Sequence, residues 1–140
     1  EPKLDELDLN FESLGYEVIT KTVLAKKSID ENDFQNAITL FKDIYVKISS
    51  SNIAKSSKEV LLEQYSENIV RLHMELDDFE NGDIFIKENM IHTARFHDVA
   101  GDFYKYFGEH DEANIQYDKA LSFDMDESQK NLINLKRPIK

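Results

Sequence analysis

Residues 77–88, with the sequence DDFENGDIFIKE, carry the residue types that a calcium-binding EF-hand loop uses. Such a loop has oxygen ligands at its first, third and fifth positions, Gly at the sixth, an aliphatic residue at the eighth and Glu at the twelfth. Asp77, Asn81 and Glu88 supply three of these ligands, and the glycine and the aliphatic residue also match. Phe79, however, places a benzene ring where a hard cation requires an oxygen. We therefore interpret the stretch as a turn between helices, with a calcium-responsive helical protein as the alternative.

Histidine is the other residue type that could hold a metal ion, and the chain has four of them. Two histidines on a helix bind one zinc ion when they lie three or four residues apart on one face. His92 and His97 are five residues apart, so we expect their side chains to point in different directions. His73 and His97 fit positions in the helix packing, and His92 and His110 fit turns. The sequence therefore predicts no metal centre.

The sequence also lacks the motifs of the common enzyme classes. It has no nucleophile elbow, no glycine-rich phosphate loop, no paired carboxylates in a recognisable setting and no cysteine. The formal net charge of −11 repels phosphate backbones and anionic lipid. No apolar run approaches the roughly 18 to 20 residues of a membrane span. We expect a non-enzymatic protein with no cofactor, no nucleic-acid partner and no membrane insertion, whose partner is another protein.

The elements that position these residues are helices. Only four Gly and two Pro occur in 140 residues, and both Pro lie near the ends of the chain. Residues 93–125 give the clearest pattern, because apolar residues recur at spacings of three and four on either side of a polar break at 107–111. Small residues lie among the aromatic ones on the inner faces, so two antiparallel helices can approach closely. They are Ala100, Gly101, Ala113 and Ala120.

The same reading predicts further helices along the chain. We expect them at about 11–29, from 34 onward, at 57–76, at 79–90 and from 124 or 126 to 136, with residues 1–10 as a frayed leader or a short cap. Ser49-Ser50-Ser51-Asn52 is expected to be a loop, and Ser56 with Glu59 a capping box. Expected caps are Asn32 or Asp33, Asp77-Asp78, and Asp124 or Asp126. Candidate apolar positions are Leu14, Ile19, Val23 and Leu24 in the first helix and Val60, Leu61, Tyr65, Ile69 and Leu72 in the third.

The hairpin at 93–125 also serves as a ruler for the rest of the chain. Its landmarks are Gly101, Tyr104, Gly108, Ala113, Tyr117 and Ala120, at spacings of three, four, five, four and three. The same spacings upstream select Ala25, Ser28, Asn32, Ala37, Phe41 and Ile44, and then Val70, His73, Asp77, Gly82, Ile86 and Asn89. The chain is therefore predicted to hold three helix-turn-helix units and a terminal helix.

With these landmarks the chain resembles the tetratricopeptide repeat family, whose second helix carries an Ala-aromatic-Ala pattern after a turn glycine. The unit at 93–125 matches best; it departs from the family at His97, where Trp is common, and at Met125, where Pro is common. The resemblance implies an all-α fold in one domain, 1–140: a right-handed superhelix of three antiparallel repeats. The repeats are expected at about 11–48, 57–90 and 93–123, with a capping helix at about 126–136.

In the resembled family the first helix of each pair lines a concave groove that binds a partner peptide or helix. The resemblance places Lys26, Asn68, Arg71, Met74, Arg95, Asp98, Asp102, Lys105 and Tyr106 on that groove, together with Ile19, Thr22, Ile29, Gln64 and Glu67. Members that grip a chaperone's C-terminal carboxylate use a Lys, Arg and Asn clamp. Here Lys26 and Val99 replace two of the clamp residues, so a basic or amphipathic protein segment is the better partner.

The chain begins at Glu1 rather than Met and has no signal-like segment. We therefore expect a processed chain or an excised domain. A cysteine-free, acidic sequence fits the cytoplasm and the bacterial periplasm equally well.

Overall fold

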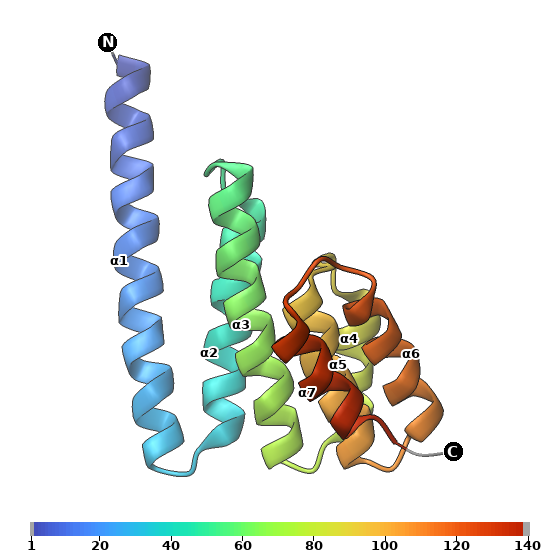
Figure 1. Ribbon diagram of the computed structural model, residues 1–140. Helices are drawn as coiled ribbons and strands as arrows, with labels where there is room; N and C mark the ends of the chain where they lie inside the picture. Colours follow the sequence, from blue (N-terminus) through green and yellow to red (C-terminus); the bar gives the residue numbers. More distant parts are fainter. Residues whose placement is uncertain (1, 139–140) are drawn as a thin grey trace. The chain divides into compact units, whose positions relative to one another are not determined.

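The computed structural model describes residues 2–138, with side chains described from Ser13 onward. This part of the chain is helical and contains no β-strand, which confirms the predicted all-α class. The helices form two compact units, Glu1–Leu72 and His73–Lys140. Figure 1 shows the helices in chain order: α1 (Pro2–Asp30), α2 (Phe34–Ser50), α3 (Lys55–Glu75), α4 (Phe79–Glu88), α5 (Ala94–Tyr106), α6 (His110–Leu121) and α7 (Glu127–Lys136).

In the first unit, α1 and α2 pack side by side and α3 covers the second of them. The apolar face of α2 is fully buried because its large residues recur at spacings of three and four. Phe41 meets Tyr65 of α3 with ring centroids 5.8 Å apart. The residues that fill this core are Ala25, Ala37, Ile38, Phe41, Ile44, Ile48, Leu62, Tyr65, Ile69 and Val70.

Charged side chains reinforce the α1–α2 pair along its edge. Glu17 and Lys21 of α1 face Asp43 and Lys47 of α2, and each lysine pairs with both carboxylates. Because signs alternate around this ring of four, every charge has two opposite neighbours. Such a network holds two helices in register better than a single exposed pair does.

In the second unit, α5 and α6 form a close hairpin whose core is aromatic. Phe103 of α5 and Phe107, the C-cap residue of that helix, gather around Phe79 of α4, with ring centroids 5.7 and 5.4 Å from that ring. Two glycines let rings lie on helix backbones: Gly82 lies under Phe103, and Gly101 lies under Tyr117. The small residues predicted for the inner faces, Ala100, Gly101, Ala113 and Ala120, are all buried.

The turns within three helix pairs share one geometry, at the positions that the landmark spacing selects. Asn32, Asp77 and Gly108 have positive φ angles of 61°, 56° and 78°. The next residue in each case donates its N–H to a carbonyl five residues back, which is the bond of a Schellman motif. The pairs are Asp33 with Ser28 (2.8 Å), Asp78 with His73 (2.9 Å) and Glu109 with Tyr104 (2.8 Å).

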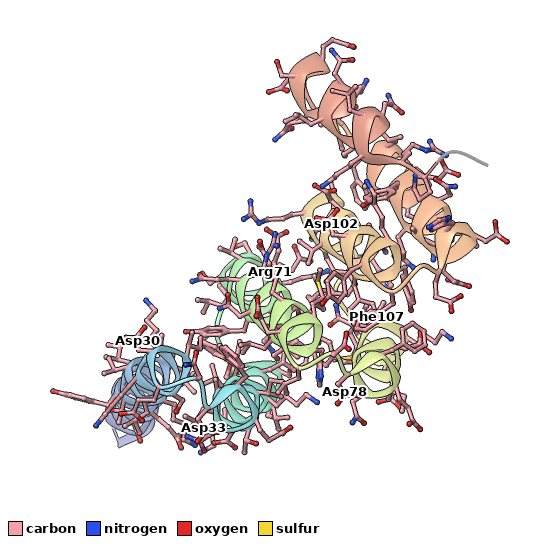
Figure 2. All side chains as sticks on the ribbon, turned by 90° about the horizontal axis from the view of Figure 1, so that it is seen from below. Asp30, Asp33, Arg71, Asp78, Asp102 and Phe107 are labelled. Carbon is pink, nitrogen blue, oxygen red and sulfur yellow. The ribbon has the colours of Figure 1, made fainter. Side chains whose placement is uncertain are left out.

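The predicted caps are also found. Asp33, Asp78 and Asp126 each accept a hydrogen bond from the backbone N–H three residues ahead, at 3.2, 3.2 and 2.8 Å. Asp33 and Asp78 are labelled in Figure 2 at the beginnings of α2 and α4. A left-handed residue thus ends one helix and an aspartate starts the next, so the sequence itself specifies where the chain reverses.

Several predicted boundaries are wrong. α1 begins at Pro2 rather than near residue 11, so residues 2–10 continue this helix instead of forming a frayed segment or a separate cap. Glu1 and the side chains before Ser13 lie outside the described part. α2 continues through Ser49 and Ser50, whose hydroxyls donate to carbonyls four residues back within the helix. α3 begins at Lys55, so Ser56 lies inside its first turn and cannot be an N-cap. α4 ends at Glu88, two residues earlier than expected.

Some candidate core positions are exposed. Val60 is 67% exposed, and Leu62 is buried in its place. On α1, Ile19, Val23 and Leu24 are also exposed, because the face that packs on α2 centres on Ala25 instead. Tyr65, Ile69 and Leu72 are buried as predicted. No helix in residues 2–138 is long and apolar enough to cross a bilayer.

Candidate partner-binding surface

Helix α5 separates its residues sharply between two faces. The apolar face is buried and consists of Phe96, Val99, Ala100, Phe103 and Tyr104. The other face carries Arg95, Asp98, Asp102, Lys105 and Tyr106, all of which keep some exposure. These five are the groove residues that the third unit was predicted to supply. Their spacing of three and four places them along one side of the helix.

The two aspartates of this face hold a lysine. The Nζ atom of Lys136, at the end of α7, lies 2.6 Å from Oδ1 of Asp98 and 2.9 Å from Oδ1 of Asp102. The three side chains are only about a third exposed or less: 32% for Lys136, 31% for Asp98 and 24% for Asp102. We name this arrangement the lysine seat, formed by Asp98 and Asp102 of α5 and Tyr117 of α6.

Tyr117 completes the lysine seat from the neighbouring helix. Its hydroxyl donates a 2.6 Å hydrogen bond to Oδ1 of Asp102, and its ring centroid lies 5.6 Å from Nζ of Lys136. The ring face therefore attracts the ammonium group while the hydroxyl orients one of the carboxylates. Burial, reinforced by the bond to Asp102, raises the pKa of Tyr117 above its ordinary value of 10.0. Tyr117 stays a hydrogen-bond donor throughout the physiological range.

The charge of Lys136 follows from the same surroundings. Partial burial acts to lower the pKa of Lys136, but the hydrogen bonds and charges of Asp98 and Asp102 outweigh it, and the pKa is raised. Two carboxylates around one ammonium leave the lysine seat with a net charge of about −1 when it is filled. In Figure 2, Asp102 lies on the side of α5 from which α7 approaches.

The end of α7 has three more polar attachments. Lys105 donates from Nζ to the carbonyl of Lys136 at 2.6 Å, which satisfies one of the last carbonyls of the helix. Arg137 lies 2.7 Å from Asp118 of α6, and Asn114 donates to the carbonyl of Pro138 at 3.4 Å. Three residues expected on an open groove, Asp98, Asp102 and Lys105, therefore contact the chain's own C-terminal helix.

The remaining groove candidates lie as follows. In the first unit Lys26 is exposed on α1, Asn68 is half-buried on α3, and Arg71 is exposed beside Glu67, 3.2 Å away (Figure 2). In the second unit Met74 is half-buried, and Arg95 and Tyr106 are exposed.

Two further residues of the groove argument have structural roles. The hydroxyl of Thr22 lies 2.8 Å from that of Tyr65, so Thr22 joins α1 to α3 within the first unit. Val99 is 3% exposed and belongs to the core.

Residues 77–88 are a turn followed by a helix. Phe79–Glu88 form α4, with Asp78 as its N-cap, and the side chain of Asn81 donates to Oδ2 of Asp78 at 2.8 Å. Asp77 is the left-handed residue of the turn, and Glu88 lies at the far end of α4. Among the side chains that the structure describes, in residues 13–138, no three His, Asp or Glu lie together as a metal site requires.

The histidines are partly as expected. His73 and His97 are buried, and His97 shares a 2.8 Å hydrogen bond with Gln116. The expectation that His92 and His97 point in different directions is wrong, because their rings stack with centroids 5.4 Å apart. His92 precedes the N-cap of α5, so helical spacing does not govern its direction.

Comparison with known proteins settles the family. A family model described as a tetratricopeptide repeat-like domain matches residues 1–138. The chain belongs to this family. Tetratricopeptide repeat-like domains generally mediate protein–protein interaction and are typically non-enzymatic. The search of curated proteins and the search of solved structures gave no match.

Sequence reasoning selected the aspartates of the lysine seat but missed Tyr117 and Lys136 as their partners. Tyr117 was assigned to packing alone, as a family landmark. The available signal was the spacing Asp98–Asp102, four residues apart on one helix face, where two like charges repel unless a cation lies between them. This pair therefore favours a lysine or arginine near α5.

Proposed function

We propose that this tetratricopeptide repeat-like chain is a non-enzymatic interaction module that binds a segment of a partner protein. In this proposal residues 1–140 act as one domain, in which repeats at about 11–48, 57–90 and 93–123 stack as a right-handed superhelix capped by 126–136. The first helix of each pair faces the partner, as the family resemblance implies. The family's general role supports the class of function, and the groove is our extension of it.

The observation that carries the proposal is the chemistry of the exposed face of α5. That face already holds an ammonium group between Asp98 and Asp102, with Tyr117 beneath it. Tyr106, 57% exposed at the end of the same helix, offers an aromatic surface to an apolar residue. Acidic pairs with aromatic neighbours bind basic or amphipathic segments. The formal net charge of −11 favours the approach of such a segment.

The other groove candidates add positive and neutral groups to the aspartates of α5. Arg71 and Arg95 are positive, and Asn68 and Met74 offer an amide and a flexible thioether. A mixed surface of this kind selects a partner by the pattern of its charges. We therefore propose that the partner segment has lysines spaced to reach Asp98 and Asp102, and an acidic residue that pairs with Arg71 or Arg95.

Site-specific cross-linking tests the proposal. A photo-reactive amino acid is placed at Arg95 or Tyr106 of α5 and, as the control, at Ile115 of α6, which is 46% exposed. Cross-linked partner segments are then identified by mass spectrometry. We expect one and the same segment at both α5 positions, enriched in lysine, and not at position 115.

Charge changes give the second arm of the test. Arg71→Glu and Asp102→Asn are each expected to weaken cross-linking while the circular dichroism of the helices is retained. Lys87→Glu is the control for Arg71→Glu, because it changes the charge by the same amount at a side chain that is 63% exposed on α4, and it should not weaken cross-linking. Capture that survives both Arg71→Glu and Asp102→Asn would place the partner elsewhere.

A further inference from the structure

Helix α7 is attached chiefly through its last turn. Ile133 is its one buried apolar residue, at 4% exposure, while Leu132 and Leu135 are 62% and 82% exposed. The other attachments described above are polar, and they involve Lys136, Arg137 and the carbonyls that follow. A helix held by one apolar side chain and several partly exposed ion pairs is weakly fixed, because water and salt screen such pairs.

The short length of α7 also indicates that this helix is weakly fixed. It has 10 residues, and isolated helices shorter than roughly 12 residues are marginal in water. By contrast, α5 and α6 bury complete faces against each other. Of the helices in the second unit, α7 therefore loses the least apolar contact when it detaches.

The lysine seat does not depend on α7 for its shape. Asp98 and Asp102 belong to α5, Tyr117 belongs to α6, and the hydrogen bond from Tyr117 to Asp102 joins the two helices directly. Without a cation, two carboxylates four residues apart on a helix repel each other, so the empty seat favours any ammonium group that reaches it. A lysine of another chain can satisfy it in the same way as Lys136.

We propose that α7 is a built-in competitor of the partner segment, whose Lys136 occupies on α5 the place that a partner lysine takes when the partner binds. This inference rests on the proposed function of the α5 face. Partner binding then involves an exchange: the partner's lysine enters between Asp98 and Asp102, and α7 leaves through release of Lys136 and Arg137. Weak, non-specific cations therefore do not displace Lys136, whereas a segment that also contacts residues outside the lysine seat does.

The covalent link between α6 and α7 makes Lys136 an effective competitor. A segment linked by a short flexible chain has an effective concentration on the order of millimolar at its own site. Residues 122–126 connect α6 to α7, so Lys136 returns to the seat readily after each opening. A free segment of equal intrinsic affinity therefore occupies the seat only at comparable concentration, unless Lys136 is removed.

The probe for this exchange is a fluorescent peptide with the sequence of residues 126–138, added to the full chain at low ionic strength and followed by anisotropy. Lys136→Met in the full chain keeps the apolar stem over Tyr117 but removes the ammonium. We expect the Lys136→Met chain to bind the peptide at least about tenfold more tightly than the wild type. Lys130→Met is the matched control, because Lys130 pairs with Glu127 of its own helix, at 3.9 Å, and it should behave like the wild type.

Two more variants locate the binding. Adding Asp98→Asn and Asp102→Asn to Lys136→Met should abolish the gain, and a peptide carrying Lys136→Met should not bind. Equal peptide affinity in wild type and Lys136→Met would overturn the competitor role. Undiminished binding to the chain that lacks both aspartates would overturn the lysine seat as the place of exchange.

Hydrogen exchange on the wild-type chain provides a readout that needs no folded variant. Saturating peptide should speed exchange of the α7 amides and leave those of α5 and α6 protected; unchanged α7 exchange at saturation contradicts displacement. Cross-linking from Arg95 and Tyr106 separates this inference from the proposed function. Partner cross-links that persist while α7 stays protected reject only the competitor, whereas absence of partner cross-links at α5 rejects the proposed function as well.

Discussion

Gly101 of α5 lies directly against the ring of Tyr117 of α6: a Cβ atom at position 101 would stand 2.4 Å from Cε1 of that ring. The hydroxyl of the same tyrosine donates to Asp102, the next residue. The arrangement recurs one helix earlier, where Gly82 lies under Phe103 and Asp83 accepts a 2.5 Å hydrogen bond from Tyr104. In both places a glycine lets an aromatic ring of the next helix approach closely. The aspartate that follows the glycine then accepts a hydrogen bond from a tyrosine hydroxyl of that helix.

This contact predicts that Gly101→Ala destabilises the fold. Tyr117 is fully buried and cannot move aside, so the added methyl group overpacks the α5–α6 contact, at a cost of about 1 to 3 kcal/mol. Gly82→Ala should act likewise through Phe103. Urea unfolding measures both.

Gly15→Ala is the matched control for these substitutions, because nothing lies within 4 Å of its added Cβ and the residue is inside α1. It should raise stability by about 0.5 to 1 kcal/mol through helix propensity alone. If Gly101→Ala gave the same gain, the close packing of α5 on Tyr117 would be disproved.

The shared turn geometry predicts which substitutions of Gly108 destabilise the fold most. Its φ angle is 78° and no atom lies within 4 Å of an added Cβ, so substitutions there test the backbone alone. Gly108→Val should cost about 1 to 2 kcal/mol, because a β-branched residue is strained in the left-handed region. Gly108→Asn should cost less than half of that, since Asn32 takes the same conformation in the equivalent turn. Equal losses in thermal unfolding would mean that the turns are not equivalent.

What could be predicted from the sequence follows from local rules. The turns at Asn32, Asp77 and Gly108 depend on residues within five positions of one another, and cap chemistry identifies them. The hairpin at 93–125 was found because small and aromatic residues share one helical period. The start of α1 was missed because Pro2 is acceptable in the first turn of a helix and nothing at residue 11 obliges the chain to begin there.

The lysine seat could not be predicted in the same way. Asp98 and Lys136 are far apart in sequence and meet only because α7 folds back over α5. Likewise, Val60 and Leu62 both fit an apolar pattern, and only the packing of α3 decides that Leu62 is buried. The family resemblance identified which face of α5 is polar, but it could not tell that the chain's own helix lies on it.

The conformation of residues 77–88 predicts the outcome of a calcium titration. Because Phe79–Glu88 are helical and Asn81 bonds with Asp78, the ligand positions of an EF-hand loop do not surround one point. Terbium luminescence and calorimetry should show no binding at millimolar calcium, and Asp77→Asn with Glu88→Gln should not change the result. Saturable binding that these two substitutions remove would restore the calcium-responsive alternative.

The buried tyrosines predict how stability changes at high pH. Burial first, and then the carboxylates of Asp83 and Asp102, raise the pKa of Tyr104 and Tyr117 above the ordinary value of 10.0. The unfolded chain loses these two protons near about pH 10, while the folded chain keeps them. Because the folded state then binds more protons, the free energy of unfolding must fall as pH rises above about 10, by up to about 1.4 kcal/mol per pH unit for each tyrosine.

Phenylalanine variants isolate this contribution. Tyr104→Phe and Tyr117→Phe should each lower stability at neutral pH by about 1 to 3 kcal/mol, because a carboxylate loses its donor. The difference in unfolding free energy between wild type and variant should become smaller above about pH 10. There the wild type is destabilised by titration of this tyrosine, and the variant lacks the titrating group. Urea unfolding at a series of pH values measures this difference, with Tyr16→Phe, at a residue that is 75% exposed, as the control for the substitution itself. A deficit that stays constant or grows with pH would show that these hydroxyls are not held protonated by the fold.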